Sequence, residues 1–165
     1  MEQLLDKLSR YHILNNLIPG IVFLYIIDAI GIYSTAFDNA YGVFFIGYIA
    51  GMVLSRLGSI IIEPWFKNWN IVNYAPYPDF LKAEQKDNKI NILLEENNMY
   101  RTLVTLFIVV LLLYVCSLIS VINTFMHTKW AVLVIIVLLL IVYVLAYRKQ
   151  TSYIKRRVEN AIKNI

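Results

Sequence analysis

The stretch that most constrains this chain is Tyr41–Ile62, YGVFFIGYIAGMVLSRLGSIII, which is long enough and apolar enough to cross a membrane as a helix. Small residues recur in it at every fourth position: Gly47, Gly51, Ser55 and Ser59. Positions four apart lie on one face of a helix. Another helix can approach such a face closely, and helices commonly pack this way in lipid. We predict that this face packs against another helix, either within one subunit or between subunits.

The composition is typical of an integral membrane protein. Hydrophobic residues make up 59% of the 165 residues and charged residues only 16%, whereas ordinary soluble domains carry about 25% charged residues. The apolar residues are also gathered into runs of membrane length rather than spread along the chain. These runs predict four transmembrane helices, at residues 13–35, 41–62, 102–122 and 130–147.

The distribution of basic residues predicts the orientation of these spans. Lysine and arginine gather before the first span, between the second and the third, and after the fourth, whereas only Lys129 lies across the opposite boundary. The positive-inside rule then places both termini and the middle segment in the cytoplasm. We therefore predict an all-α membrane protein with cytoplasmic helical extensions, divided into an interfacial amphipathic helix (1–12), a first transmembrane hairpin (13–62), a cytoplasmic or interfacial helical segment (63–100), a second hairpin (101–147) and an amphipathic basic tail helix (148–165).

Prolines and acidic residues predict several helix boundaries. Pro19 removes an intrahelical hydrogen bond, so we expect a kink or a break in the first span. Glu63 and Pro64 are expected to end the second span. In the segment that follows, Asp79 is expected to cap a short helix, and Asp87 or the next residue to start a second one. Nothing interrupts the helical spacing of that second helix before the third span, so we predict that the two are continuous.

The chain offers little material for enzyme chemistry. His12 and His127 lie on opposite sides of the predicted membrane and cannot share a metal ion within one subunit. Cys116 has no histidine at its depth, and the sequence contains no phosphate-binding glycine loop or hydrolase motif. We interpret Glu95 and Glu96 as a solvated helix surface rather than a metal site. We therefore expect no catalytic activity, no cofactor and no metal site.

Polar residues inside the predicted spans are stronger functional candidates, because ionisable groups are costly in lipid. One interpretation is that Arg56 extends to the inner headgroups while Asp28 meets water at the outer boundary. The alternative is that both line a water-filled path with Asn15 and Asn16 at its cytoplasmic mouth. In an oligomer such residues form rings, and rings of charge select ions.

Basic and aromatic residues mix on the predicted cytoplasmic side. Membrane topology and contact with anionic lipids can account for this pattern. A cytoplasmic site for an anionic ligand, such as a nucleotide or short oligonucleotide with aromatic side chains for base stacking, is the alternative. The basic residues that could contact an anionic ligand or lipid in this way are Lys82, Lys86, Lys89, Lys155, Arg156 and Arg157.

The opening RYHILNNLIPGIVFLY, with its aromatic-Asn-Pro-Gly pattern, resembles the start of small four-span membrane effectors of bacterial anti-phage defence systems. The similarity is to the Hailong-type effectors and, less closely, to the membrane subunit of Kiwa-type systems. It covers the first span and the four-span layout, and it carries over no ligand-binding residue. It implies a homo-oligomeric channel of the bacterial inner membrane, with a tetramer favoured, that stays silent until infection and then depolarises the membrane. In the Hailong case, the controlling ligand would be a DNA oligomer made by a partner nucleotidyltransferase.

These observations lead to three functional hypotheses. The first is an oligomeric ion channel or membrane-disrupting effector that is gated from the cytoplasm. The second is a non-conducting membrane anchor that recruits a cytoplasmic partner protein through residues 63–100 and 148–165. The third is a small transporter, which is disfavoured because the two halves of the chain are unequal and only the first carries a broken span.

Overall fold

The computed structural model describes residues 2–32, 39–87, 89–119, 122, 124, 134–148 and 159. Every regular element in these residues is helical, as the all-α prediction requires. Two of the helices, Ala40–Asn68 and Lys89–Ser117, are long and apolar enough to cross a membrane. The apolar helical stretches Ile13–Ala29 and Val134–Arg148 are shorter than that.

Helix α1 (Glu2–Ala29) is continuous, so the expected interfacial helix and first span form a single helix. The helix does not break at Pro19, which is fully buried, and packing against neighbouring helices lets a proline stay within a membrane-type helix. The helix ends at Ala29, before the predicted limit of the span at residue 35. Gly31 adopts a positive φ of 69°, and the amide of Ile32 donates to the carbonyl of Ile27 at 3.0 Å, a common way to terminate a helix.

The second apolar helix consists of three consecutive elements, α2 (Ala40–Leu57), the π-helix η1 (Gly58–Ile62) and α3 (Glu63–Asn68). The Asn39 side chain caps its start by accepting from the amide of Gly42 at 2.6 Å. The prediction that Glu63 and Pro64 end this helix is wrong, because it continues for another turn. Pro64 follows the wide π-turn and lies in the first turn of α3, where a missing amide is tolerated.

The segment between the two membrane-length helices contains helix α4 (Tyr77–Lys86). Asp79 lies in the first turn of α4 and does not cap it, since the cap position is Pro76. Helix α5 (Lys89–Ser117) begins where Asp87 predicts, with the Asp87 carboxylate accepting from the amide of Lys89 at 2.9 Å. The prediction that this helix runs unbroken into the third apolar stretch is confirmed as far as Ser117.

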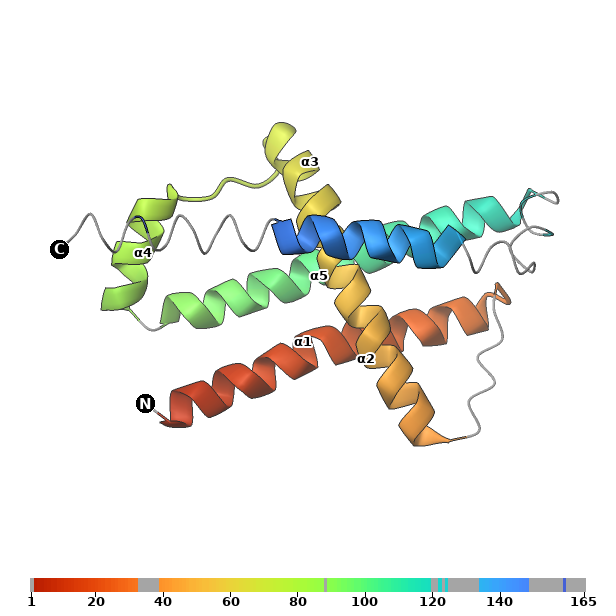
Figure 1. The fold of residues 1–165 in the computed structure, drawn as a ribbon, viewed down its shortest axis with the longest axis horizontal. Helices are drawn as coiled ribbons and strands as arrows, with labels where there is room; N and C mark the ends of the chain where they lie inside the picture. The colour runs from red at the N-terminus through yellow and green to blue at the C-terminus, as the bar shows by residue number, and fades with distance from the viewer. Residues whose placement is uncertain are drawn as a thin grey trace.

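The helices form a layered bundle (Figure 1). Helices α1 and α5 run in the same direction and contact each other, while the helix Ala40–Asn68 crosses them and packs on both. The most extensive contact in the described chain is between α1 and α2. The helix Val134–Arg148, blue in Figure 1, runs opposite to α5.

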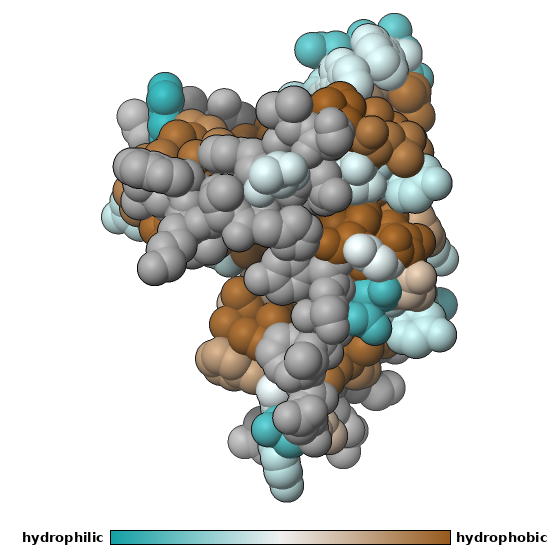
Figure 2. All heavy atoms as spheres, turned by 90° about the vertical axis from the view of Figure 1, so that its right-hand side faces the viewer, coloured by the Kyte–Doolittle hydropathy of each residue, from teal (hydrophilic) through white to brown (hydrophobic). Residues whose placement is uncertain are grey.

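Apolar side chains cover much of the molecular surface. Only 28% of the most apolar window of Ala40–Asn68 is buried, and only 17% of that of Lys89–Ser117. Figure 2 shows the resulting hydrophobic surface in brown. The core helix of a soluble protein would be mostly buried, whereas exposed aromatic and aliphatic side chains such as Phe45, Phe107 and Leu111 suit contact with lipid. The two helices therefore suggest a membrane protein.

Candidate functional site

Helices α1 and α2 meet backbone to backbone at three glycines. A Cβ atom on Gly51 would overlap the carbonyl oxygen of Asn16, and one on Gly20 would overlap that of Gly47. The face of small residues predicted in the second span therefore packs against α1 of the same chain at Gly47 and Gly51. Gly20 was not singled out in the sequence, where the preceding proline drew attention to a helix break. The other two members of the predicted face lie elsewhere: Ser55 is next to a pocket, and Ser59 is half-buried in η1.

The contact between η1 and α5 is built differently, from threonine and arginine side chains. A Cβ atom on Gly58 would lie 2.5 Å from the hydroxyl of Thr105 and 3.3 Å from Cγ of Arg101. Thr102 and Thr105 are each 1% exposed. Their hydroxyls donate to the carbonyls of Asn98 and Arg101, both at 2.8 Å, so these polar groups are satisfied within α5.

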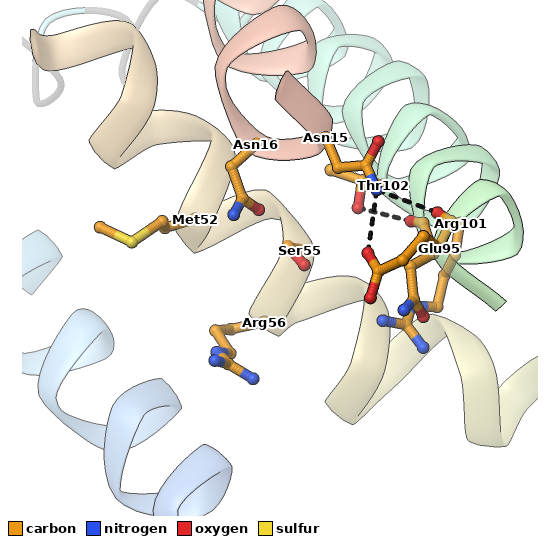
Figure 3. Close-up of a pocket in the computed structure, with 9 residues that line it drawn as sticks. Asn15, Asn16, Met52, Ser55, Arg56, Glu95, Arg101 and Thr102 are labelled. Carbon is orange, nitrogen blue, oxygen red and sulfur yellow. Dashed lines mark hydrogen bonds between the residues drawn. The ribbon is translucent and has the colours of Figure 1, made fainter. Parts of the chain in front are cut away.

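A polar pocket of about 130 Å³ lies where α1, α2 and α5 come together (Figure 3). Helix α1 supplies two side-chain amides, α2 supplies one arginine, and α5 supplies the carboxylate, a third amide and the second arginine. The residues that line it are Asn15, Asn16, Met52, Ser55, Arg56, Glu95, Asn98, Arg101 and Thr102. The structure thus brings Asn15, Asn16 and Arg56 together, as the hypothesis of a shared polar path expects, and adds residues of α5 that the sequence did not indicate.

Asn15 joins α1 to α5 at this pocket. Its amide donates to the carboxylate of Glu95 at 3.0 Å and to the carbonyl of the same residue at 3.1 Å. Asn15 and Asn16 are 8% and 6% exposed. The interpretation of Glu95 and Glu96 as a solvated pair is therefore wrong for Glu95, which is half-buried, while Glu96 is exposed. Adjacent residues on a helix point about 100° apart, so α1 covers one carboxylate and leaves the other in solvent.

A buried carboxylate joins α3 to α5 beside the pocket. Glu63 is 8% exposed and accepts from Arg101 at 2.6 Å and from Lys67 at 2.8 Å. The sequence analysis missed this pair. A signal was present, since Glu63 directly follows the second predicted span and Arg101 directly precedes the third, which puts both on the same side of these two predicted spans.

Two weaker contacts continue from Lys67 to the loop after α3. The Lys67 ammonium lies 4.3 Å from the centre of the Tyr74 ring, a cation–π distance. The Tyr74 hydroxyl in turn accepts from the amide of Asn97 on α5 at 3.2 Å. Asn97 and Arg101 are one turn apart, so α5 is tied to α3 and its following loop at two successive turns.

Arg56 differs from the other charged residues of the pocket. Its side chain is exposed, and in Figure 3 it extends from α2 away from the Asn15–Glu95 hydrogen bonds. No carboxylate in the described part of the chain forms a salt bridge with it. Asp28, which was grouped with Arg56 as a candidate, does not line the pocket and lies about 18 Å further along α1 than Asn16.

The predicted basic candidates that the structure describes do not line this pocket. Lys82, Lys86 and Lys89 are exposed on α4 and at the start of α5. Lys155, Arg156 and Arg157 lie outside the described residues. Among the described residues, no three His, Cys, Asp or Glu side chains are grouped so that they could hold a metal ion.

The pocket lies at one end of the apolar part of α5. Residues 89–101 of this helix are largely polar, with Arg101 as the last charged one, and residues 103–117 are almost entirely apolar. The pocket is lined by Glu95 to Thr102, at the transition between the two parts. No protein-family model, curated protein or solved structure matches this chain.

Proposed function

We propose that this chain is a multi-pass protein of the bacterial inner membrane that assembles into an ion channel and depolarises the membrane as an effector of anti-phage defence. The observation that carries the proposal is the polar pocket between α1, α2 and α5, which adjoins helices of membrane length. Buried amides and charged side chains at that level are costly in a protein that only anchors itself in lipid.

The pocket supplies the groups that an ion path needs at its mouth. Asn15 and Asn16 place polar amides at the pocket, and Arg56 carries a charge that is exposed. In a homo-oligomer, with a tetramer favoured by the resemblance, the Arg56 side chains would form a ring of positive charge. Such a ring would favour anions or set a barrier to cations.

Gating from the cytoplasm fits the construction of α5. This single helix begins at Lys89 among basic residues and continues into the apolar stretch. A ligand or partner that moves its first turns would therefore act directly on the pocket wall. The resemblance suggests a DNA oligomer as that ligand, and the mixed basic and aromatic residues would also suit a nucleotide. The positive-inside rule predicts that both termini and residues 63–100 lie on the cytoplasmic side.

A non-conducting anchor is the second candidate, and one observation favours it. Gly47 and Gly51 are already used for contact between α1 and α2 of one chain. That part of the small-residue face is therefore not available between subunits, and oligomerisation needs another surface. In this alternative, residues 63–100 and 148–165 would recruit a cytoplasmic protein, and the buried polar groups would only hold the helices together.

The proposal is tested by recording the membrane potential of bacteria that express the chain, using a voltage-sensitive dye. A channel should depolarise the cells, and Arg56→Ala should change the extent or rate of depolarisation by removing the exposed charge. Asp28→Asn is a second probe, which tests whether the path extends along α1 beyond the pocket. Glu96→Gln serves as the control, because Glu96 is exposed and lies outside the pocket.

Equal amounts of each variant in the membrane fraction are required for this comparison. Cells that keep a normal potential with the wild-type chain folded in the membrane, both alone and with its neighbouring genes during phage infection, would contradict the channel and favour the anchor.

A further inference from the structure

We infer that the pocket between α1, α2 and α5 binds a phosphate-bearing anion, with Arg56 as its principal charged contact. The inference rests on the membrane placement given in the proposed function, but it does not depend on whether the protein conducts ions. The charges around the pocket, its neutral hydrogen-bonding groups and its position along the helices point to this ligand class.

Two charged groups of the pocket have no ionic partner in the described part of the chain: the Arg56 guanidinium, and the Glu95 carboxylate, whose hydrogen-bond partner Asn15 is neutral. Two arginines and one glutamate line the pocket. Arg101 is compensated by Glu63 at 2.6 Å, and the Glu95 carboxylate is held by the amide of Asn15 at 3.0 Å. Arg56 has no carboxylate partner among the described residues. A guanidinium at the edge of an apolar stretch is stabilised by an anion, and its planar fork matches phosphate oxygens in a bidentate manner.

Neutral hydrogen-bonding groups line the same pocket as this arginine. Ser55 precedes it on α2 and contributes a hydroxyl to the pocket, while Asn98 contributes a side-chain amide from α5. The volume of about 130 Å³ is enough for several water molecules. A phosphate group would fit in that space, and the rest of a larger ligand would extend out of the pocket.

Glu95 restricts where the anion can lie. Its carboxylate is directed at Asn15, on the side of the pocket formed by α1 and α5, whereas Arg56 extends from α2 in another direction (Figure 3). A phosphate group would therefore contact the α2 side and avoid the carboxylate. Because the two groups come from different helices, an anion at Arg56 would also affect how α2 and α5 sit together.

The position of the pocket is compatible with two sources of phosphate. It lies at the transition from the polar to the apolar part of α5, which is the level of lipid headgroups when the apolar part lies in the membrane. A phospholipid headgroup could enter from the bilayer, and a free phosphate-bearing ligand could enter from water. Both offer the same chemistry to Arg56, so the experiment has one arm for each source.

The lipid arm uses the full-length protein in nanodiscs of phosphatidylcholine alone or mixed with phosphatidylglycerol, followed by native mass spectrometry of the released protein. We expect the wild type to retain phosphatidylglycerol in preference to phosphatidylcholine. Arg56→Gln should weaken this retention by about tenfold or more, since it removes a charge-assisted contact. Arg148→Gln is the matched control: it removes the same charge from an exposed position that does not line the pocket.

The second arm measures thermal unfolding in phosphatidylcholine nanodiscs while sodium phosphate replaces sodium chloride at constant ionic strength. Phosphate should raise the unfolding midpoint of the wild type and of Arg148→Gln, but not that of Arg56→Gln. Circular dichroism establishes that each variant is helical. If Arg56→Gln does not fold, Ser55→Ala takes its place, with an expected loss of about fivefold in affinity.

The results separate the two sources and the two proposals. Arg56-dependent retention of phosphatidylglycerol alone identifies a lipid headgroup, and Arg56-dependent stabilisation by phosphate identifies a free ligand; either supports the inference. If Arg56→Gln and the wild type behave alike in both arms, the inference is overturned. A wild-type protein that depolarises cells but retains no phosphatidylglycerol and is not stabilised by phosphate would refute the phosphate site alone, whereas binding without depolarisation would refute the channel alone.

Discussion

The helix from Ala40 to Asn68 is held in two contrasting ways along its length. In its first half, Gly51 meets the backbone of α1 at Asn16, and Gly47 packs against Gly20 and Ile21 of the same helix. In its second half, Glu63 meets α5 through a charged hydrogen bond to Arg101. Arg56 and the polar pocket lie between these two regions, close to the π-turn that begins at Gly58.

The two contacts respond differently to change. The glycine contact exists because these residues have no side chain, so even one added methyl group would push the two helices apart. The ionic contact depends on a charge pair that another anion or cation can compete for. We therefore interpret α1 and α2 as a rigid hairpin, and α5 as the element that can shift against it when the charges near the pocket change.

The largest expected effect comes from Gly51→Leu, which breaks the glycine contact. Its Cβ atom would overlap the carbonyl oxygen of Asn16, and the rest of the side chain has no space to occupy. The free energy of unfolding should fall by more than about 3 kcal/mol, as measured by circular dichroism during titration of the detergent-solubilised protein with SDS. Phe45→Leu, on an exposed face of α2, should change it by less than about 0.5 kcal/mol. Equal stability of the two variants would show that α1 and α2 do not pack in this way.

The next effect is expected from Glu63→Gln, which breaks the ionic contact. Arg101 and Lys67 would both lose their carboxylate partner, and the free energy of unfolding should fall by about 2 to 3 kcal/mol. Glu96→Gln is the control, because it removes an exposed carboxylate of α5 and should be nearly neutral. The same SDS titration compares them. A Glu63→Gln protein as stable as the Glu96→Gln protein would mean that the buried pair does not hold α3 to α5.

Asn15→Ala should have an intermediate effect, because it removes the hydrogen bonds that link α1 to α5. We expect a loss of about 1 to 2 kcal/mol. A double-mutant cycle with Glu95→Ala isolates the hydrogen bond between the two side chains, which are 3.0 Å apart. The two substitutions should not be additive. Strict additivity would indicate that the pocket wall is formed without this contact.

The smallest effect is expected from Tyr74→Phe, which weakens the contact between α5 and the exposed loop after α3. The substitution removes the hydroxyl that accepts from Asn97 but keeps the ring under Lys67. Because Tyr74 is 44% exposed, the loss should be about 0.5 kcal/mol. Tyr74→Ala should cost more, since it also removes the cation–π contact. Identical losses for the two variants in thermal unfolding would show that the ring contributes nothing.

Local patterns in the sequence predicted much of the fold. The all-helical class, the apolar helix beginning near Tyr41 and the continuity of α5 all follow from spacing within one helix. The small face of α2 was also visible, but a sequence pattern says which face lacks side chains and not what covers it. Its partner on α1, Gly20, was hidden by the expectation of a helix break at Pro19, whereas the buried proline is part of a continuous helix.

The candidate site was predictable only in part, because it depends on where distant residues meet. Asn15, Asn16 and Arg56 stood out as polar groups in apolar surroundings. The pairing of Glu63 with Arg101 could not be read from helical periodicity, since the π-turn from Gly58 to Ile62 shifts the face that later residues present. Glu95 was indistinguishable from its neighbour Glu96 until the packing of α1 showed which of the two is covered.

The central claim is that the polar groups around Arg56 belong to an ion path, and planar-bilayer recording of the purified full-length protein tests it most directly. With a salt gradient across the bilayer, the account predicts discrete currents in the wild type and a shift of the reversal potential toward cation selectivity in Arg56→Glu, because the ring of charge changes sign. Currents whose reversal potential is the same in both proteins, or a folded protein that never conducts, would contradict it.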